Sequence, residues 1–283
     1  MRVFENHNMR NHSNMKVGGR AKKFIEVENK EELKEIFGGN KNIFLIGNGT
    51  NTLIDDGDLD ITFVSLKALN RIEELSEGIV RVEAGLDFNK LIAFMNRNNY
   101  TGLENLAGIP GSVGGLVYMN GGAYGSEIFD CIKEIEIFDE NYQIKTLKKE
   151  EIGFSYRSTE IQEKGWVIIS ATFDFKRGFD LKKVIEIQAL RESKQPLDKP
   201  NLGSTFKNPK GDFSARLISE AGLKGTRIGG AEISTKHPNF IINHGDATFE
   251  DISKILVLVK EKIKELYNIQ LEEEIIILKN ERI

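Results

Sequence analysis

The order of the expected helices and strands predicts an α+β fold in two parts. Helical and strand patterns are mixed along the chain without a regular alternation, and 40% of the 283 residues are hydrophobic. This length is enough for about two domains of roughly 100–200 residues each. The segment Lys176-Arg177-Gly178 is the clearest break. We therefore expect a boundary between residues 177 and 178, and a further division of the first part near residue 68.

Hydrophobic periodicity predicts the elements of the first part. Helices are expected at 31–37 and 88–98, and the second carries Leu91, Ile92 and Met95 on one face. The polar tripeptide at 139–141 separates two strand patterns and predicts a hairpin. The expected strands are Phe24–Val27, Ile43–Ile46, Thr62–Ser65, Ile79–Ala84, Ile132–Phe138, Tyr142–Leu147 and Trp166–Phe175.

The second part reads as helix, loop, helix, strand, helix and strand. The loop carries three of the five prolines, which makes it stiff and irregular. The expected first helix, Leu181–Ser193, has Val184, Ile185, Ile187 and Leu190 as its apolar face. The later elements are the helix Phe213–Ala221, the strand Asn239–Ile242, the helix Phe249–Tyr267 (with Ile252, Leu256, Val259, Ile263 and Leu266 in one stripe) and the strand Glu274–Leu278.

Composition excludes several classes of protein. The net charge of −4 argues against a nucleic-acid or anionic-membrane partner. No apolar run approaches the roughly 20 residues that cross a bilayer, and the first residues do not resemble a signal peptide. The single cysteine and four histidines have no metal-ligand spacing. We therefore expect a cytoplasmic protein without a metal.

Residues 102–125 are the most unusual segment of the chain, because eight of these 24 residues are glycine. Glycine lets backbone amides approach a phosphate without a Cβ in the way. This property makes the segment a candidate site for a cofactor diphosphate. A tight-turn loop without a ligand is equally compatible with its glycine content.

A second glycine-containing segment, Gly47–Asn51, follows an expected strand. It begins like the dinucleotide fingerprint, but Thr52 occupies the sixth position and no helix pattern follows. These differences exclude a Rossmann site. The absence of any Gly-Lys pair excludes a phosphate-loop NTPase. The segment can still present amides and a hydroxyl to a phosphate, and a plain turn is the alternative.

Three polar segments could carry chemistry. Arg157 offers a planar fork for a carboxylate or a phosphate. Ser204 lies near Lys207, which could stabilise its alkoxide. Glu274 adjoins an expected buried strand, where burial would favour its protonated form. Each also has an ordinary structural explanation. Arg157 could be a surface arginine, the Ser204 segment could be a polar turn, and Glu274 could belong to a solvated acidic cluster. Ser112 lacks the nucleophile-elbow pattern and reads as a loop residue or amide donor.

Together, and in this order, these segments resemble one family. The chain resembles the MurB family, the UDP-N-acetylenolpyruvoylglucosamine reductases, almost from end to end. The matching segments are VGGRA (17–21), LIGNGTN (45–51), ENLAGIPGSVGG (104–115), NGGAYG (120–125), FSYRS (154–158), QPLDKPNLGSTFKNP (195–209), AGLKGTRIGGAEIS (221–234), HPNFIIN (237–243) and LEEEI (271–275).

The resemblance implies an FAD-binding fold of the vanillyl-alcohol-oxidase (PCMH) type in residues 1–177. It also implies an α+β domain for the UDP-sugar in residues 178–283. FAD would be bound non-covalently, NADPH would be the co-substrate, and the protein is expected to be a monomer. The implied cofactor-binding residues are Ile46, Gly47, Asn48, Gly49, Thr50, Asn51, Gly108, Ile109, Gly111, Ser112, Val113, Gly114, Gly115 and Gly122.

The resemblance also implies the reaction and its catalytic residues. A hydride would pass from NADPH to FAD and then to the enolpyruvyl double bond. Arg157 and Glu274 would stabilise the enolate-like state, and Ser204 would protonate the α-carbon. Tyr124, Lys207 and Asn208 are the implied substrate contacts.

The chain departs from the family pattern at four positions, none of them catalytic: Asn48, Thr50, Thr159 and Pro238. Its length resembles the compact subclass, which lacks an inserted loop with a substrate-covering tyrosine. Two other readings stay open. An oxygen-using flavin oxidase would share the glycine loops but would not need Arg157, Ser204 and Glu274 together. A non-catalytic nucleotide-binding module would lack a bound yellow cofactor.

Overall fold

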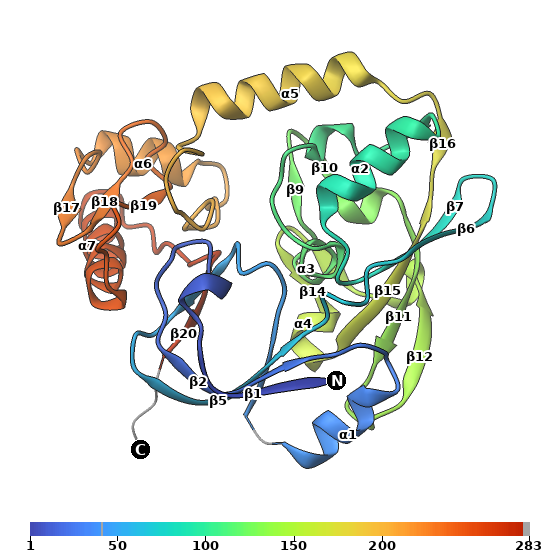
Figure 1. Cartoon of the computed structure of the whole chain (residues 1–283). Helices are drawn as coiled ribbons and strands as arrows, with labels where there is room; N and C mark the ends of the chain where they lie inside the picture. Colours follow the sequence, from blue (N-terminus) through green and yellow to red (C-terminus); the bar gives the residue numbers. More distant parts are fainter. Residues whose placement is uncertain (41, 280–283) are drawn as a thin grey trace. The chain divides into compact units, whose positions relative to one another are not determined.

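The computed structural model describes residues 1–40 and 42–279, and the chain forms two compact units (Figure 1). The first unit comprises Met1–Glu5, Lys23–Asn48 and Ile61–Leu190. The second comprises Asn6–Lys22, Gly49–Asp60 and Arg191–Ile283. Residues 68 and 177 both lie inside the first unit, so the units differ from the expected division. The assignment of the cofactor and the sugar to the two parts of the chain stays a prediction.

The units are discontinuous because three strands pass from one unit to the other. These strands form a four-stranded sheet with β3, in the order β1-β2-β5-β3, and β3 is parallel to β5. The first strand was not predicted, because its side chains are mostly exposed and show no apolar alternation. The bounds are β1 (Arg2–Asn8), β2 (Arg20–Glu26), β3 (Ile43–Ile46) and β5 (Asp58–Ser65).

A five-stranded antiparallel sheet forms the centre of the first unit. Its order is β12-β11-β15-β7-β6, and the central strand β15 is buried along almost its whole length. The predicted hairpin is confirmed, because β11 and β12 pair antiparallel. The bounds are β6 (Ile72–Ser76), β7 (Ile79–Glu83), β11 (Ile132–Phe138), β12 (Ile144–Lys148) and β15 (Val167–Asp174).

Helix α2 (Phe88–Arg97) confirms the predicted amphipathic helix of the first unit. Its predicted apolar face, together with Phe88, is buried in the core of this unit. Asp87 is the N-cap of this helix, and its carboxylate accepts a hydrogen bond of 3.0 Å from the Asn89 N–H. Such a cap is worth about 1 kcal/mol. Two further helices of this unit are α1 (Glu32–Gly39) and α4 (Glu160–Lys164).

Helix α3 (Val113–Tyr118) begins within the glycine-rich segment and was not predicted. The glycines at 114 and 115 each disfavour a helix by about 1 kcal/mol relative to alanine. Tertiary packing outweighs this preference, because α3 lies against β15 and β7 (Figure 1). A Cβ on Gly114 would lie only 2.7 Å from the Ala84 Cβ. Glycine therefore permits a close approach of helix to sheet at this point.

The junction after β15 differs from the prediction at two points. Lys176–Arg177 is not a break but the two-residue strand β16, which pairs with β8 (Tyr100–Thr101). Helix α5 (Leu181–Lys194) is present, but its predicted apolar face is only partly buried. Val184 is buried and Ile187 and Leu190 are half-buried, whereas Ile185 is 57% exposed. Periodicity identified this helix correctly, but it could not show that part of its apolar face is exposed.

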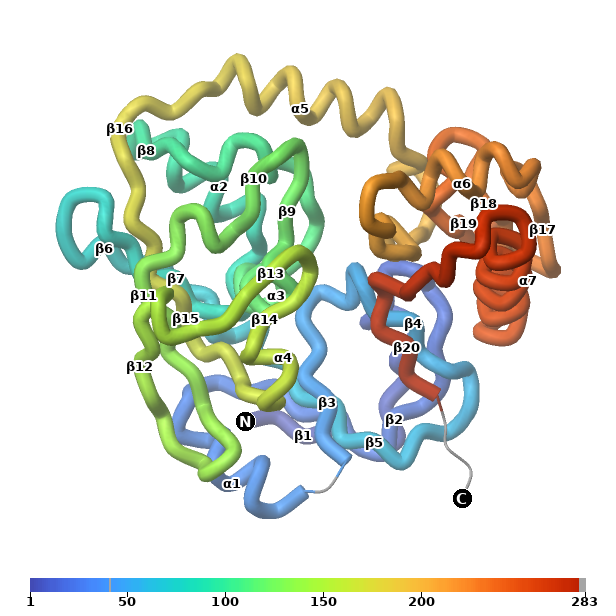
Figure 2. The backbone as a smooth tube through the Cα atoms, turned by 180° about the vertical axis from the view of Figure 1, so that it is seen from behind, coloured from blue at the N-terminus to red at the C-terminus, as the bar shows by residue number. Residues whose placement is uncertain are grey.

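The second unit has a separate core around helix α7 (Phe249–Tyr267). Its predicted stripe is buried except for Leu266, which is 48% exposed. Figure 2 shows α7 beside β17 and β18 of a small antiparallel sheet. The remaining elements of this unit are α6 (Ser214–Glu220), β17 (Arg227–Ile228), β18 (Ala231–Ile233), β19 (Ile241–Asn243), β4 (Thr52–Ile54) and β20 (Ile276–Leu278).

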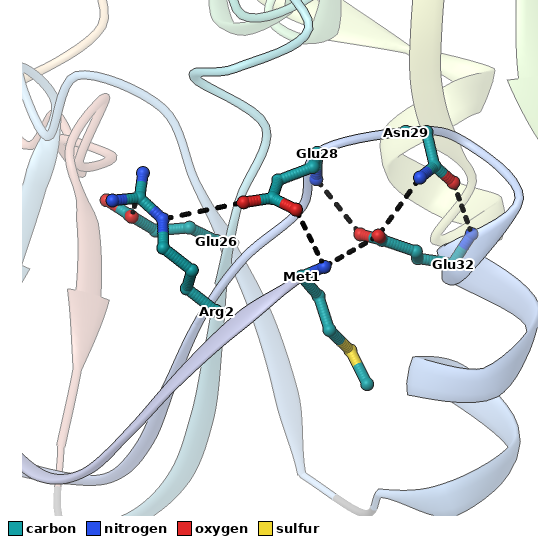
Figure 3. A network of polar contacts seen from close by, with 6 residues as sticks. All are labelled: Met1, Arg2, Glu26, Glu28, Asn29 and Glu32. Atoms are coloured by element: carbon teal, nitrogen blue, oxygen red, sulfur yellow. Dashed lines mark hydrogen bonds and ion pairs between the residues drawn. The ribbon is translucent and has the colours of Figure 1, made fainter.

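A polar network joins the start of β1 to the start of α1 in the first unit (Figure 3). The Met1 amino group donates to the Glu28 carboxylate at 3.1 Å and to the Glu32 carboxylate at 2.6 Å. Glu32 also accepts from the Glu28 N–H at 2.9 Å and from the Asn29 carboxamide at 3.0 Å. Arg2 pairs with Glu26 at 2.7 Å. Exposed ion pairs of this kind each contribute little to the free energy of unfolding. The main effect of this network is therefore to hold the start of β1 near the start of α1.

We expect Gly114→Ala to lower the free energy of unfolding by about 1–3 kcal/mol, because the added methyl group overpacks the contact with Ala84. A matched control is Gly38→Ala in α1, where a Cβ would have nothing within 4 Å. The control should gain about 0.5–1 kcal/mol from helix propensity. Urea unfolding followed by circular dichroism measures both, and equal effects would contradict the packing argument.

Candidate active site

The two candidate cofactor loops lie against each other in the first unit. A Cβ on Gly47, which follows β3, would lie 2.8 Å from the Ser112 hydroxyl oxygen of the second loop. The Asn48 carboxamide donates at 3.1 Å to Asp87, and the Asp87 backbone bridges to Ser112. Two segments that the sequence identified separately are therefore adjacent.

Ser112 is the N-cap of α3, and its hydroxyl oxygen accepts from the Gly115 N–H at 3.2 Å. The Val113 and Gly114 N–H groups donate to the carbonyl oxygens of Leu86 and Ala84, each at 2.8 Å. The backbone N–H groups of Val113, Gly114 and Gly115 are therefore all bonded within the protein.

Two glycines of the second loop adopt backbone conformations that favour glycine. Gly108 and Gly111 have φ angles of 79° and 149°, which side chains rarely allow, and backbone of this kind can turn its N–H groups toward an anion. Of the two predicted isoleucine contacts, Ile46 is buried and Ile109 is partly buried against the core. The assignment of these residues to an FAD site stays a prediction.

The other end of the Gly47–Asn51 loop belongs to the second unit. A Cβ on Gly49 would lie 1.7 Å from the His12 carbonyl oxygen, so only glycine fits there. The loop continues into strand β4 and not into a helix, in agreement with the exclusion of a Rossmann site. Thr50 is partly buried in this loop.

Asn51 has a contact that the sequence did not predict. Its carboxamide donates to the Glu274 carbonyl oxygen at 3.0 Å, and its own carbonyl oxygen accepts from the Ile276 N–H at 2.9 Å. The parallel pairing of β20 with β4 continues from this point. A predicted cofactor loop therefore also holds the backbone of a predicted catalytic residue.

Arg157 occupies a tight turn between β13 (Phe154–Ser155) and β14 (Ser158–Thr159), with a φ angle of 56°. Its guanidinium donates to the Gly122 carbonyl oxygen at 2.6 Å and to the Asn120 carbonyl oxygen at 3.4 Å. These bonds orient the guanidinium from the backbone of the glycine-rich segment.

Asn120 is a fully buried residue of this arrangement that the sequence did not single out. Its carboxamide donates to Ser155 at 3.0 Å and to Glu127 at 2.7 Å. Asn120 thereby joins the glycine-rich segment to the turn of Arg157. Thr159 donates to the Tyr118 carbonyl oxygen at 2.7 Å and caps α4, a role that either serine or threonine can perform.

Tyr124 lies in the turn between β9 (Gly122–Ala123) and β10 (Ser126–Glu127), again in the first unit. Its φ angle is 50° and its side chain is exposed. The turn is held by Asn105, whose carboxamide donates to the Ser126 hydroxyl at 2.8 Å. The carbonyl oxygen of Gly122, a predicted cofactor contact, accepts a hydrogen bond from Arg157.

In the second unit, the segments of Ser204 and Glu274 lie side by side. The Glu274 N–H donates to the Thr205 carbonyl oxygen at 2.8 Å, and the Lys207 N–H donates to the Glu272 carbonyl oxygen at 2.9 Å. The structure thus brings together two predicted catalytic segments that are 70 positions apart in sequence. Both predicted side chains are partly buried, so Glu274 is less enclosed than the sequence suggested.

Lys207 and Asn208 are also adjacent to this pair of segments. The Lys207 ammonium group lies 3.6 Å from the Glu272 carboxylate. The Asn208 carboxamide oxygen accepts from the Ser214 N–H at 3.1 Å, at the first residue of α6. This contact gives Asn208 a structural role in addition to the predicted substrate contact.

Asn239 is a further residue that sequence analysis missed. It is 3% exposed, and its side chain and backbone bond the segment that follows Ser204. The expected strand there begins later, at Ile241, because the Asn239 backbone turns toward this segment. A polar residue at the start of an apolar run was the only available signal.

Comparison with known proteins shows the class of protein to which the chain belongs. Residues 21–148 match the FAD binding domain family, and residues 195–278 match the C-terminal domain of UDP-N-acetylenolpyruvoylglucosamine reductase. The chain is therefore an FAD-binding oxidoreductase, and its predicted α+β fold is confirmed.

Whole-chain relatives define the family. A UDP-N-acetylenolpyruvoylglucosamine reductase of Fusobacterium nucleatum subsp. nucleatum is 58% identical, covering 99% of this chain and 100% of that protein. One from Lachnoclostridium phytofermentans is 40% identical, covering 97% and 92%. The crystal structure of UDP-N-acetylenolpyruvylglucosamine reductase (MurB) from Thermus caldophilus superimposes with a TM-score of 0.86 at 31% identity, covering 99% of this chain and 100% of that one. The chain belongs to the UDP-N-acetylenolpyruvoylglucosamine reductase family.

Within residues 1–40 and 42–279, no helix is both long and apolar enough to span a membrane. The same part of the chain holds no group of three or more histidine, cysteine or acidic side chains placed to bind a metal ion.

His237, which precedes Asn239 by two residues, is expected to make stability depend on pH. Burial lowers the pKa of its imidazole, whose edge packs on Phe240. The unfolded chain binds the proton at the ordinary pKa of about 6.5, so the contribution of His237 is present above that value and is lost as pH falls. Urea unfolding at about pH 8 and about pH 5.5 should show a larger loss for the wild type than for His237→Asn. Parallel pH profiles would rule out this contribution.

Proposed function

We propose that the protein reduces the enolpyruvyl ether of UDP-N-acetylglucosamine to UDP-N-acetylmuramate, with NADPH as the hydride source. Family membership over the whole chain supports this reaction. The observation that carries the proposal is the pairing of the Ser204 and Glu274 segments, because the reaction needs a proton donor near a group that stabilises developing negative charge.

We propose that FAD is bound non-covalently by Gly47–Asn51 and by the loop from Gly108 to Gly115. The adjacency of Gly47 and Ser112 supports a single site built from both loops. The isoalloxazine ring would supply the hydride transfer, and the protein supplies position and electrostatics. In this proposal the amides of Val113 and Gly114 shape the loop, because they already bond to the protein.

Arg157 and Glu274 are proposed to stabilise the charge that develops during reduction. Hydride addition to the β-carbon of the enol ether leaves negative charge on the α-carbon and its carboxylate. A guanidinium that the backbone already orients can bind that carboxylate without reorganisation. Glu274 can help only as a neutral acid or by sharing a proton with the developing enolate.

Ser204 is proposed to protonate the α-carbon, which completes the lactyl ether. A serine hydroxyl is a weak acid, so its alkoxide needs a nearby cation, and Lys207 is three residues away in the same segment. Lys207, Asn208 and Tyr124 are proposed to contact the UDP-sugar. We further propose that the protein acts as a cytoplasmic monomer.

The decisive test is anaerobic mixing of NADPH-reduced protein with the enolpyruvyl sugar nucleotide. Rapid return of oxidised-flavin absorbance, with UDP-N-acetylmuramate as product, is the expected result. Reoxidation only on admission of oxygen would favour an oxidase, and protein purified without a yellow colour would favour a binding module.

Ser204→Ala should retain FAD and be reduced by NADPH at the wild-type rate. Its reoxidation by the enolpyruvyl sugar should be slower by about 10²–10⁴-fold, the usual contribution of a positioned general acid. Stopped-flow absorbance separates the two half-reactions. Wild-type rates of product formation in this variant would remove Ser204 from the mechanism.

A further inference from the structure

We propose that Asn239 is a positioning residue that sets the place of Ser204 relative to Glu274. This inference rests on the proposed function, since it concerns the proton donor of that reaction. Asn239 is 3% exposed and lies in the second unit with both residues. It bonds to the chain immediately after Ser204 and not to Ser204 itself, so it would act through the backbone.

The Asn239 carboxamide binds one residue through both of its functional groups. Its oxygen accepts from the Phe206 N–H at 3.0 Å, and its nitrogen donates to the Phe206 carbonyl oxygen at 2.8 Å. The Asn239 carbonyl oxygen also accepts from the Thr205 N–H at 2.8 Å. Through these three bonds, Asn239 pairs with residues 205 and 206 in the way that a neighbouring strand would.

The opposite edge of the same segment pairs with the acidic segment at residues 272–274. There the Thr205 carbonyl oxygen and the Lys207 N–H bond to the backbone of Glu274 and Glu272, and Phe206 forms a bridge with Glu273. The segment is therefore bonded on both edges. Loss of the two side-chain bonds of Asn239 would leave this edge with only the bond from the Thr205 N–H to the Asn239 carbonyl oxygen, so the segment that follows Ser204 would be held less firmly.

Only a side chain that both donates and accepts can make the two bonds to Phe206. Aspartate has the same size but, when ionised, would place a second oxygen against the Phe206 carbonyl oxygen. Burial beside this carbonyl would raise the pKa of such an aspartate, and its neutral form would regain a donor. In Asn239→Asp, the two side-chain hydrogen bonds to Phe206 should therefore depend on pH.

Asn243 provides a matched control in the same unit. It is 1% exposed, and its carboxamide donates to the Met15 carbonyl oxygen at 2.8 Å and accepts from the Gly245 and Ala247 N–H groups at 2.6 Å and 3.0 Å. Asn243→Asp thus introduces the same chemical conflict in a buried site, but it acts on a backbone segment other than that of Ser204.

The experiment measures the two half-reactions of FAD-loaded wild type, Asn239→Asp and Asn243→Asp by anaerobic stopped flow at about pH 8. We expect Asn239→Asp to be reduced by NADPH at the wild-type rate but to be reoxidised by the enolpyruvyl sugar about 10–100-fold more slowly, since a displacement of about 1 Å can cost this much. Asn243→Asp should match the wild type within about twofold in both steps. Lowering the pH toward about 6 should restore Asn239→Asp relative to the wild type, because its acid regains the donor.

The outcomes separate the two proposals. If the wild-type flavin is not reoxidised by the sugar, the proposed function fails. If the wild type is reoxidised but Asn239→Asp equals Asn243→Asp, or loses both half-reactions equally, the positioning role is overturned. Should Asn239→Asp not fold, Asn239→Ser and Asn243→Ser are compared in the same way, with the same expected contrast in the reoxidation step.

Discussion

The backbone pairing of residues 205–207 with residues 272–274 is the constraint on which the candidate site depends in the second unit. It places a serine and a glutamate on adjacent segments although neither residue lies in a long regular element. The pairing is continued by β20 against β4, which brings in the end of a cofactor loop through Asn51. One hydrogen-bonded layer therefore holds residues with three different proposed roles.

In the first unit, glycine permits contacts that a larger residue would prevent. Gly47 and Gly114 allow close approaches that a Cβ would prevent, one between two loops and the other between a helix and a sheet. The carbonyl oxygen of Gly122 accepts a hydrogen bond from the Arg157 guanidinium. Glycines that looked like ligand contacts in the sequence are thus also packing residues, and the two uses share the same physical reason: the absence of a side chain.

Sequence analysis predicted the longer elements well where burial follows periodicity. Helices α2 and α7 and strands β3 and β11 agree closely with the expected bounds. It failed where tertiary contacts outweigh local preference. Helix α3 forms despite two glycines, and β16 forms from a segment that the sequence predicted to be a break. Periodicity also could not show that Ile185, on the predicted apolar face of α5, is exposed.

The sequence by itself determined the family, because nine ordered motifs are distributed along almost the whole chain. The family also determined the class of chemistry, whereas the residues that would perform it stay predictions. Only the tertiary structure decided how those residues are held. Asn120 and Asn239 bond to segments 35 and 33 positions away, and Asn51 to a residue 223 positions away. The spacing of residues along one segment cannot reveal such partners, because hydrogen bonds between distant segments depend on the folded path of the whole chain.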